Sequence, residues 1–394
     1  MSVTSQFDIG TMADKPAVAQ RAAAIGGKLA NIQILRAVAA FMVVIYHCGM
    51  EMTEIGNATG RKLFFDHDPW GTGVVLFFAI SGFIMVATNY NAFGKPGAPL
   101  DFMKRRVMRI VPLYWVITTL AVIGVTLAPQ MLKVPVNDIG YIVSSYLFWP
   151  EARVNGLVRP LATPGWTLNL EMMFYVVFAV ALLFPRRVGL AFTLIMLGGM
   201  SLCHVLGVFA ADGALASVPL NFWSDPIIIG FMLGMLVGVF YEMGFRIPGW
   251  PALAIAAIGM MLLMHSAIPG LPEDNFYVRI ADAVPAAIVL TAFALGPQID
   301  GSRLAWRFPL AVGEASYSLY LTHEFILRPF RSLWLAKLGA FLPYWSFLAF
   351  GSVLALTVGF GCYYVVERPA SRLLNPKNKH AKLVTPVGAQ SASA

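Results

Sequence analysis

Long apolar stretches recur along almost the whole chain, and they limit the possible folds more than any other feature. A helix needs about 20 apolar residues to cross the hydrocarbon layer of a bilayer. Only 12% of the 394 residues are charged and 58% are hydrophobic, whereas soluble domains carry roughly 25% charged residues. A soluble fold could not bury that much apolar surface. The sequence therefore predicts an all-α polytopic membrane protein.

Hydropathy predicts about ten membrane-spanning helices, with only short loops between them. They cover residues 31–50, 71–90, 110–128, 165–184, 189–210, 220–241, 250–267, 277–296, 311–335 and 342–366. The apolar segment 141–149 is too short to cross and is bounded by Asp138 and Pro150, so we expect it to be re-entrant or interfacial. Residues 30–372 are predicted to form one transmembrane domain. Residues 1–29 and 373–394 are predicted to be tails, the second one disordered.

The distribution of basic residues predicts the orientation in the membrane. With the N-terminus in the cytoplasm, most of the 28 Lys and Arg residues lie on the cytoplasmic side, including the pair Arg186 and Arg187. Cytoplasmic loops of membrane proteins are enriched in these residues. We therefore expect both termini in the cytoplasm.

The net charge of +8 and the three cysteines exclude some functions. The charges lie at the predicted helix ends and not on a soluble domain, so we expect no nucleic-acid partner. Cys48, Cys203 and Cys362 are too scattered for a disulfide framework or a zinc site, and no other metal-ligand spacing is found. We expect no bound metal.

Arg36 and His47 lie within the first predicted span, where a charged or titratable group is costly. Their separation of 11 residues returns to within roughly 20° of the same helix face, about 16 Å further along the axis. One face thus carries a cation at one end and an imidazole deeper in the membrane. A structural alternative is that Arg36 binds lipid phosphates and His47 only joins a hydrogen-bond network.

Basic residues also gather at the start of the third predicted span. Arg106 and Arg109 share a helix face beside Arg105, and their guanidinium groups are suited to a polyanion such as a phosphorylated cofactor. Equally, these charges could set the topology and bind anionic lipid.

Glu171 is an acid inside the fourth predicted span, within the segment 164–175. It lies about five residues in, roughly 8 Å along the axis, a depth similar to that expected for His47. We therefore expect the two side chains to meet, with the carboxylate fixing the tautomer of the imidazole. The alternative is an ion pair between Glu171 and an unrelated Arg or Lys.

The ninth predicted span has a polar first half, from Ser316 to Glu324. His323 is a candidate functional residue, with a structural hydrogen bond between helices as its alternative. Its neighbour Glu324 points about 100° away, so the two need not serve the same site. In the sixth span, glycines at positions 230, 234 and 238 predict close packing against another helix.

Taken together, these segments resemble the membrane-bound acyltransferase 3 family, and the opening is most similar to its exopolysaccharide-production branch. The similarity covers roughly residues 30–372. It rests on Arg36 with His47 after ten intervening residues, the run 77–82 (FFAISG), Arg106-Val107-Met108-Arg109, the stretch 166–175, the segment 316–323 and the triplet Glu367-Arg368-Pro369.

The resemblance implies a bacterial inner-membrane O-acyltransferase that moves an acetyl group from cytoplasmic acetyl-CoA to a sugar hydroxyl of a polysaccharide, oligosaccharide or glycolipid. Family members often carry an extra soluble domain; we expect none here, and so we expect loops 51–70 and 129–164 to recognise the acceptor. The implied roles are as follows: His47 and Glu171 catalytic; Arg36, Arg106, Arg109, Ser81 and Gly82 in acetyl-CoA binding; Trp166, Tyr175, Tyr317 and His323 supporting.

For Ser81 and Gly82, the small side chains would leave room for the pantetheine arm, and helix packing explains them equally well. His47 would act either as a general base in direct transfer or as a nucleophile that first takes the acetyl group. The rival functions are a proton-coupled transporter or flippase, for which no inverted repeat is found, and a non-catalytic scaffold. The acceptor, the acyl group and the oligomeric state are left open.

Overall fold

The structure is a computed structural model that describes residues 29–60, 68–127, 138–266, 268, 270–271, 275–339 and 341–373. Within these ranges the chain is helical and contains no strand, apart from one isolated β-bridge between Ala152 and Val158. Of the two predicted tails, only Leu29 and Leu373 lie within the described residues. The all-α prediction is confirmed.

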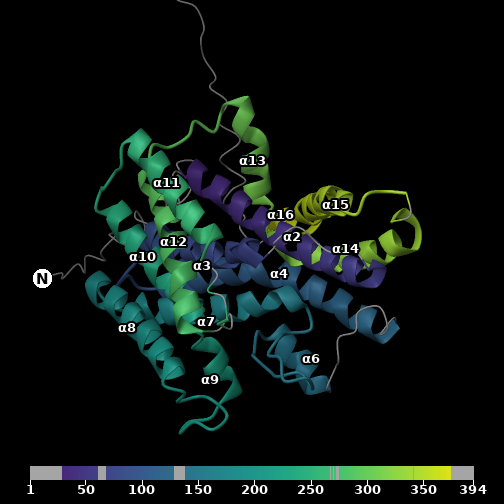
Figure 1. Ribbon diagram of the computed structural model, residues 1–394. Coiled ribbons are helices and arrows are strands. Elements are labelled where there is room, and N and C mark those ends of the chain that lie inside the picture. The colour runs from purple at the N-terminus through teal and green to yellow at the C-terminus, as the bar shows by residue number, and fades with distance from the viewer. Residues whose placement is uncertain are drawn as a thin grey trace, which may run out of the picture.

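The helices follow one another as shown in Figure 1. They are α2 (Ala30–Thr59), α3 (Gly73–Asn89), α4 (Ala98–Leu127), α6 (Ile139–Tyr146), α7 (Trp166–Ala181), α8 (Arg186–Val205), α9 (Val218–Trp223), α10 (Ile229–Glu242), α11 (Gly249–Met264), α12 (Phe276–Leu295), α13 (Leu304–Glu314), α14 (Ser316–Leu333), α15 (Ser346–Cys362) and α16 (Arg368–Leu373). Short 3₁₀ turns cover Asp68–Thr72, Thr163–Gly165 and Pro226–Ile228, and π-helical turns cover Trp334–Leu338 and Tyr363–Glu367.

Each of the ten predicted spans overlaps at least one of these helices. Seven described helices are long and apolar enough to cross a membrane, namely α2, α3, α4, α8, α10, α12 and α15 with the short turns that extend them. The other three predicted spans correspond to α7 and α11, with 16 residues each, and α14, with 18 residues and several charges. The protein is thus a multi-pass membrane protein.

Two segments differ in how they compare with the prediction. Helix α6 has eight residues and begins where the Asp138 carboxylate accepts a hydrogen bond from the Tyr141 N–H at 2.8 Å. It is too short to cross, as predicted for residues 141–149. The ninth span, predicted as continuous from residue 311, instead breaks at Ala315 into α13 and α14.

Helices α2 and α4 cross the centre of the bundle (Figure 1). Helix α3 packs on α10 and α12, α11 packs on α12, and α14 packs on α15, while α2 contacts α3, α12, α13, α14 and α15. Helix α2, which carries Arg36 and His47, therefore packs against both the group of α3 and α12 and the group of α13, α14 and α15.

The close contact between α3 and α10 depends on glycine. A Cβ atom at Gly234 would lie 1.9 Å from the carbonyl oxygen of Ala79, and one at Gly82 would lie 2.1 Å from the carbonyl oxygen of Phe231. Gly230 and Gly238 also face α3. The predicted packing role of the glycines at positions 230, 234 and 238 is confirmed.

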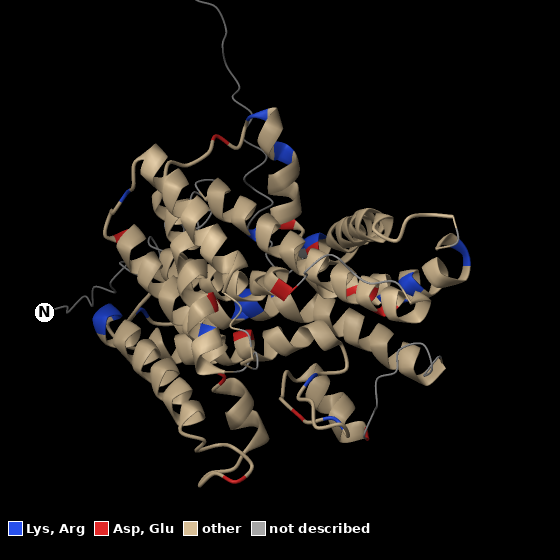
Figure 2. Cartoon of the chain, viewed as in Figure 1, with Lys and Arg blue, Asp and Glu red and all other residues tan. Residues whose placement is uncertain are grey.

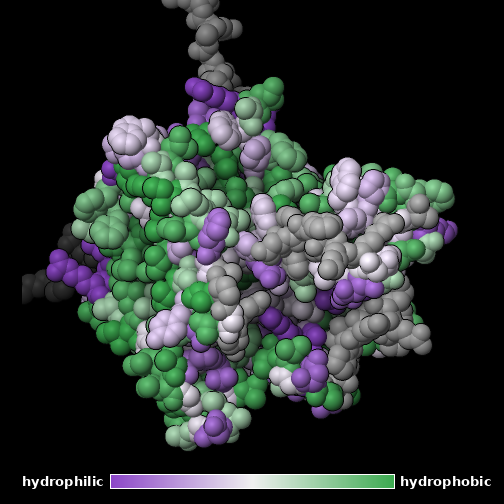
Figure 3. Space-filling model, viewed as in Figure 1, coloured by the Kyte–Doolittle hydropathy of each residue, from purple (hydrophilic) through white to green (hydrophobic). Residues whose placement is uncertain are grey.

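The outer surface is suited to lipid. Large apolar side chains point outwards, with Ile195 74%, Leu253 73% and Val353 62% exposed. Figure 3 shows a broad hydrophobic surface on the left of the view, where α8 and α10–α12 lie. Charged residues are few along the helices but recur in the middle of the bundle (Figure 2).

Candidate active site

Close helix contacts hold the polar face of α2 inside the bundle. A Cβ atom at Gly313 would lie 2.0 Å from the Gln33 carbonyl oxygen, and one at Gly73 would lie 2.7 Å from that of Ala39. Helices α13 and α3 therefore press directly on the backbone of α2. Arg36, between these two contacts in sequence, is only 8% exposed.

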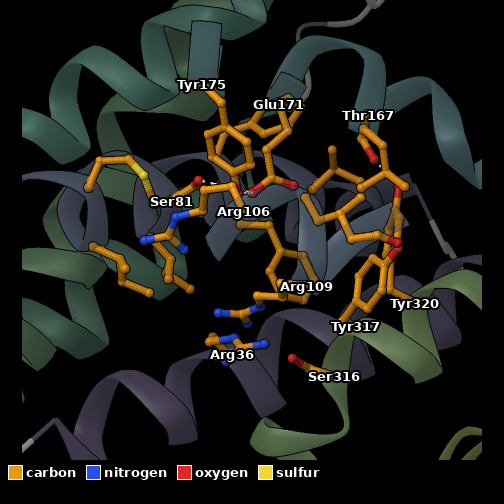
Figure 4. Close-up of a pocket in the computed structure, with 18 residues that line it drawn as sticks. Arg36, Ser81, Arg106, Arg109, Thr167, Glu171, Tyr175, Ser316, Tyr317 and Tyr320 are labelled. Carbon is orange, nitrogen blue, oxygen red and sulfur yellow. Dashed lines mark hydrogen bonds between the residues drawn. The ribbon is translucent and has the colours of Figure 1, made fainter. Parts of the chain in front are cut away.

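Arg36, Arg106 and Arg109 line one cavity, which we call the arginine cavity (Figure 4). It contains about 730 Å³ of empty space, part of it open to solvent. Its lining comes from α2, α3, α4, α7 and α14 and consists of Arg36, Val74, Phe77, Phe78, Ile80, Ser81, Ile84, Met85, Arg106, Arg109, Ile110, Thr167, Leu168, Glu171, Tyr175, Ser316, Tyr317 and Tyr320. The structure thus brings Arg36 of the first predicted span together with Arg106 and Arg109 of the third.

None of these three arginines forms an ion pair with another residue that the structure describes. Arg36 donates a hydrogen bond to the Gln33 amide oxygen at 2.9 Å. The Arg106 guanidinium lies 5.6 Å from the ring centres of Phe102 and Tyr175, and its buried Nε finds no hydrogen-bond partner among the described residues. Cations at this depth are costly without partners, and the cavity thus gathers three guanidinium groups around one carboxylate, that of Glu171.

Glu171 lies in the arginine cavity and not beside His47. Its Oε1 accepts hydrogen bonds from the hydroxyls of Tyr175 and, at 3.1 Å, of Ser81 (Figure 4). Tyr317 lines the same cavity and donates to the Ile110 carbonyl oxygen at 2.7 Å. The predicted contact between Glu171 and His47 is wrong, because similar depth on two helices does not bring their side chains to the same place in the membrane plane.

The carboxylate that meets His47 is Glu324. His47 Nε2 lies 3.1 Å from Glu324 Oε1, and His47 Nδ1 lies 3.2 Å from Nε2 of His323. His323 is fully buried, and its Nδ1 lies 3.3 Å from the Leu319 carbonyl oxygen. His323 and Glu324 therefore meet the same ring although they point about 100° apart on α14, because they face different nitrogens of His47.

These contacts hold the His47 ring at both nitrogens. Glu324 can accept a hydrogen bond from Nε2–H and so orient the ring. Nδ1 also lies 3.0 Å from the Val43 carbonyl oxygen. The hydrogen-bonded chain runs from His323 through His47 to Glu324 and on to Arg328, whose Nη2 donates to Glu324 Oε2 at 2.8 Å.

The same cluster has the donor atoms of a metal site. Ligand atoms of His47, His323 and Glu324 all lie within 4.8 Å of one another. However, His323 faces Nδ1 of His47 and Glu324 faces Nε2, so the contacts join the three residues in a line through the His47 ring. We interpret the cluster as a hydrogen-bonded chain.

Two other predicted site residues lie outside both the arginine cavity and the His47 cluster. Gly82 packs against Phe231, so the helix-packing alternative holds for it, whereas its neighbour Ser81 lines the cavity. The Trp166 ring lies 4.2 Å from the Arg159 guanidinium. Their assignment to acetyl-CoA binding and to substrate support remains a prediction.

Sequence reasoning missed the part played by Glu324, Thr167 and Tyr320. The hydroxyls of Thr167 and Tyr320 are 2.9 Å apart, and the Tyr320 ring centre lies 5.9 Å from that of His323. Tyr320 thus links the arginine cavity to the His47 cluster. The signal in the sequence was the density of polar residues in the first half of α14.

Comparison with known proteins identifies the kind of site. Residues 29–364 match the acyltransferase domain family. The chain belongs to this family. The acyltransferase is 33% identical over 309 residues to the exopolysaccharide production protein ExoZ of Rhizobium meliloti, covering 76% of this chain and 89% of that protein. It is 25% identical over 386 residues to the acyltransferase MdmB of Streptomyces mycarofaciens, covering 91% and 96% of the two chains. No solved structure matches the chain significantly.

Membership in this family fits the two features of the site, a cavity lined by arginines and a half-buried histidine. Its α2 displays Arg36 at the cavity and His47 about 16 Å further along the same face. An acyl transfer needs a bound donor and a group that accepts a proton from the acceptor, or takes the acyl group itself. Both requirements have candidates on one helix.

Proposed function

We propose that this acyltransferase moves an acetyl group from acetyl-CoA to a sugar hydroxyl of an exported or lipid-linked polysaccharide or oligosaccharide. The observation that carries the proposal is the arginine cavity, whose three guanidinium groups form no ion pair with a described residue, next to the cluster of His47, His323 and Glu324. A saccharide acceptor is supported by the similarity to a protein named for exopolysaccharide production.

The donor fits the arginine cavity by charge. Its phosphates would bind Arg36, Arg106 and Arg109, because guanidinium groups bind phosphate through paired hydrogen bonds. The buried Oγ of Ser316 and Nε of Arg106 both lack a partner among the described residues, and both line this cavity. The pantetheine arm would then extend past Ser81 and Tyr320 towards His47.

The acceptor hydroxyl would react beside His47. In direct transfer, its oxygen attacks the thioester carbonyl carbon while His47 takes the hydroxyl proton, with Glu324 holding the ring. The carbon–sulfur bond breaks, and the CoA thiolate leaves and regains the proton from the imidazolium. In the other route, a ring nitrogen of His47 first takes the acetyl group, releasing CoA, and the sugar oxygen then displaces the nitrogen.

This proposal also gives an orientation. CoA is a cytoplasmic anion, so the end of α2 that carries Arg36 would face the cytoplasm of a bacterial inner membrane. The distribution of Lys and Arg supports the same orientation, with both termini in the cytoplasm. Acetyl-CoA would then never need to cross the membrane.

Labelled transfer tests the proposal directly. Protein in nanodiscs is incubated with acetyl-labelled acetyl-CoA and a glycan extract from the producing cells. We expect one CoA thiol for each acetyl group that appears on the glycan as an alkali-labile ester. Absence of both acetyl-CoA binding and thiol release would reject the proposal, and saccharide movement across vesicles would then favour a carrier.

A further inference from the structure

The triplet Glu367-Arg368-Pro369 belongs neither to the lining of the arginine cavity nor to the His47 cluster. Its first residue ends the π-helical turn Tyr363–Glu367 and is the one buried residue of that turn, with 8% of its surface exposed. Such turns are frequent at functional sites. A buried carboxylate is also costly unless hydrogen-bond donors or cations lie nearby. Glu367 therefore needs partners inside the bundle.

The π-helical turn places Glu367 directly behind the wall of the arginine cavity. The turn packs against α4, which carries Arg109, and against α14, which contributes Ser316 and Tyr317 to the cavity lining. Ser318, which is fully buried, donates a hydrogen bond from its Oγ to Glu367 Oε2. The Tyr317 hydroxyl binds the backbone of α4 beside Arg109, so the two helices hold a fixed position around the carboxylate.

The charge of Glu367 acts on the arginines of the cavity. Its carboxylate interacts electrostatically with the guanidinium groups of Arg36 and Arg109, without forming an ion pair with either one. Glu171 is the carboxylate inside the cavity and also interacts with Arg36. One carboxylate thus faces the arginines from within the cavity and another from behind its wall. In a protein interior, this compensation lowers the cost of cations that have no ligand bound.

We propose that Glu367 is a charge-compensating residue of the donor site, which stabilises the arginine cavity when it is empty and weakens its hold on CoA. This inference rests on the proposed function. A fixed carboxylate both replaces part of the negative charge that the phosphates bring and repels that charge. Loss of the Glu367 charge should therefore tighten the binding of an anion. Loss of a merely structural contact would instead weaken it.

An isosteric substitution tests the sign of this effect. Glu367→Gln removes the charge and keeps an oxygen that can accept the Ser318 hydrogen bond. We expect its Kd for CoA, measured by calorimetry in nanodiscs, to fall at least about threefold, because the empty cavity loses a compensating charge. Glu314→Gln is the matched control, since the exposed Glu314 accepts a hydrogen bond from Tyr363 of the same turn at 3.2 Å. It should bind CoA as wild type does.

A double variant covers the case in which Glu367→Gln does not fold. If the cause is uncompensated charge, combining Glu367→Gln with Arg109→Gln should restore folding, because one positive and one negative charge are then removed together. Monodisperse elution in detergent and a cooperative unfolding transition report folding. A double variant that also fails to fold would show that the carboxylate makes an indispensable structural contact, and would overturn the proposal.

The outcomes separate this inference from the proposed function. Tighter CoA binding by Glu367→Gln, with Glu314→Gln unchanged, is the predicted result. If wild type binds CoA and Glu367→Gln binds it equally or more weakly, the charge role of Glu367 is wrong and the proposed function stands. If wild type binds neither acetyl-CoA nor CoA, both are wrong.

Discussion

At the scale of single residues, the partner of His47 determines how its ring is held. Glu324 contacts His47 Nε2 at 3.1 Å, whereas Glu171 is bonded to Ser81 and Tyr175 in the arginine cavity. The two acids therefore serve different parts of the site. This division can be measured. Replacing Glu324 should lower turnover, whereas replacing Glu171 should change the affinity for the donor.

We expect Glu324→Gln to lower the transfer rate by on the order of 10²-fold, the lower end of what a general acid–base arrangement contributes. The amide keeps the size of the side chain but no longer holds an imidazolium. Acetyl-CoA affinity should be unchanged. Glu171→Gln is the matched comparison, and a loss of turnover confined to that variant would restore Glu171 as the partner of His47.

The arginines of the cavity give a second prediction at this scale. Arg109→Ala should weaken acetyl-CoA binding about 10- to 100-fold, because a hydrogen bond to a charged group contributes about 1.5–3 kcal/mol. Arg109→Lys should recover part of this loss. Arg307→Ala, an exposed arginine outside the cavity, is the control. Equal Kd values for all of these variants would show that the phosphates bind elsewhere.

At the scale of elements, α3 and α10 must touch for the site to keep its shape. We expect Gly234→Ala to destabilise the protein by about 1–3 kcal/mol, the usual range for overpacking, because the added carbon would meet the backbone of Ala79. Gly199→Ala is the control, since a Cβ atom there meets nothing within 4 Å. Unfolding midpoints in detergent compare the two, and a Gly234→Ala midpoint equal to that of Gly199→Ala would contradict the packing argument.

Helix positions followed from the sequence, but side-chain partners did not. The apolar lengths predicted where α2 and α4 lie, and the 100° rotation per residue placed Arg36 and His47 on one face. Neither quantity says which helices are neighbours. The role of Glu324 depended on α14 lying against α2, which no local pattern encodes, and so depth alone paired His47 with the wrong acid.

At the scale of the whole molecule, the described helices place the arginine cavity close to the pair of His47 and His323. Helices α2, α4, α7 and α14 each contribute residues to the arginine cavity. The distribution of Lys and Arg predicts which end of this bundle faces the cytoplasm. The ten predicted spans were sufficient to identify a membrane protein. The arginine cavity was not visible as a cavity in the sequence, because its lining comes from five helices that are distant along the chain.

The central claim is that His47 takes part in the chemistry of transfer and not in donor binding. The most direct measurement compares wild type with His47→Ala in nanodiscs, following acetyl transfer to glycan and the Kd for acetyl-CoA in the same preparations. We predict that the variant binds acetyl-CoA as tightly as wild type and transfers acetyl groups about 10²- to 10⁴-fold more slowly. A folded His47→Ala protein that transfers at the wild-type rate would contradict this mechanism.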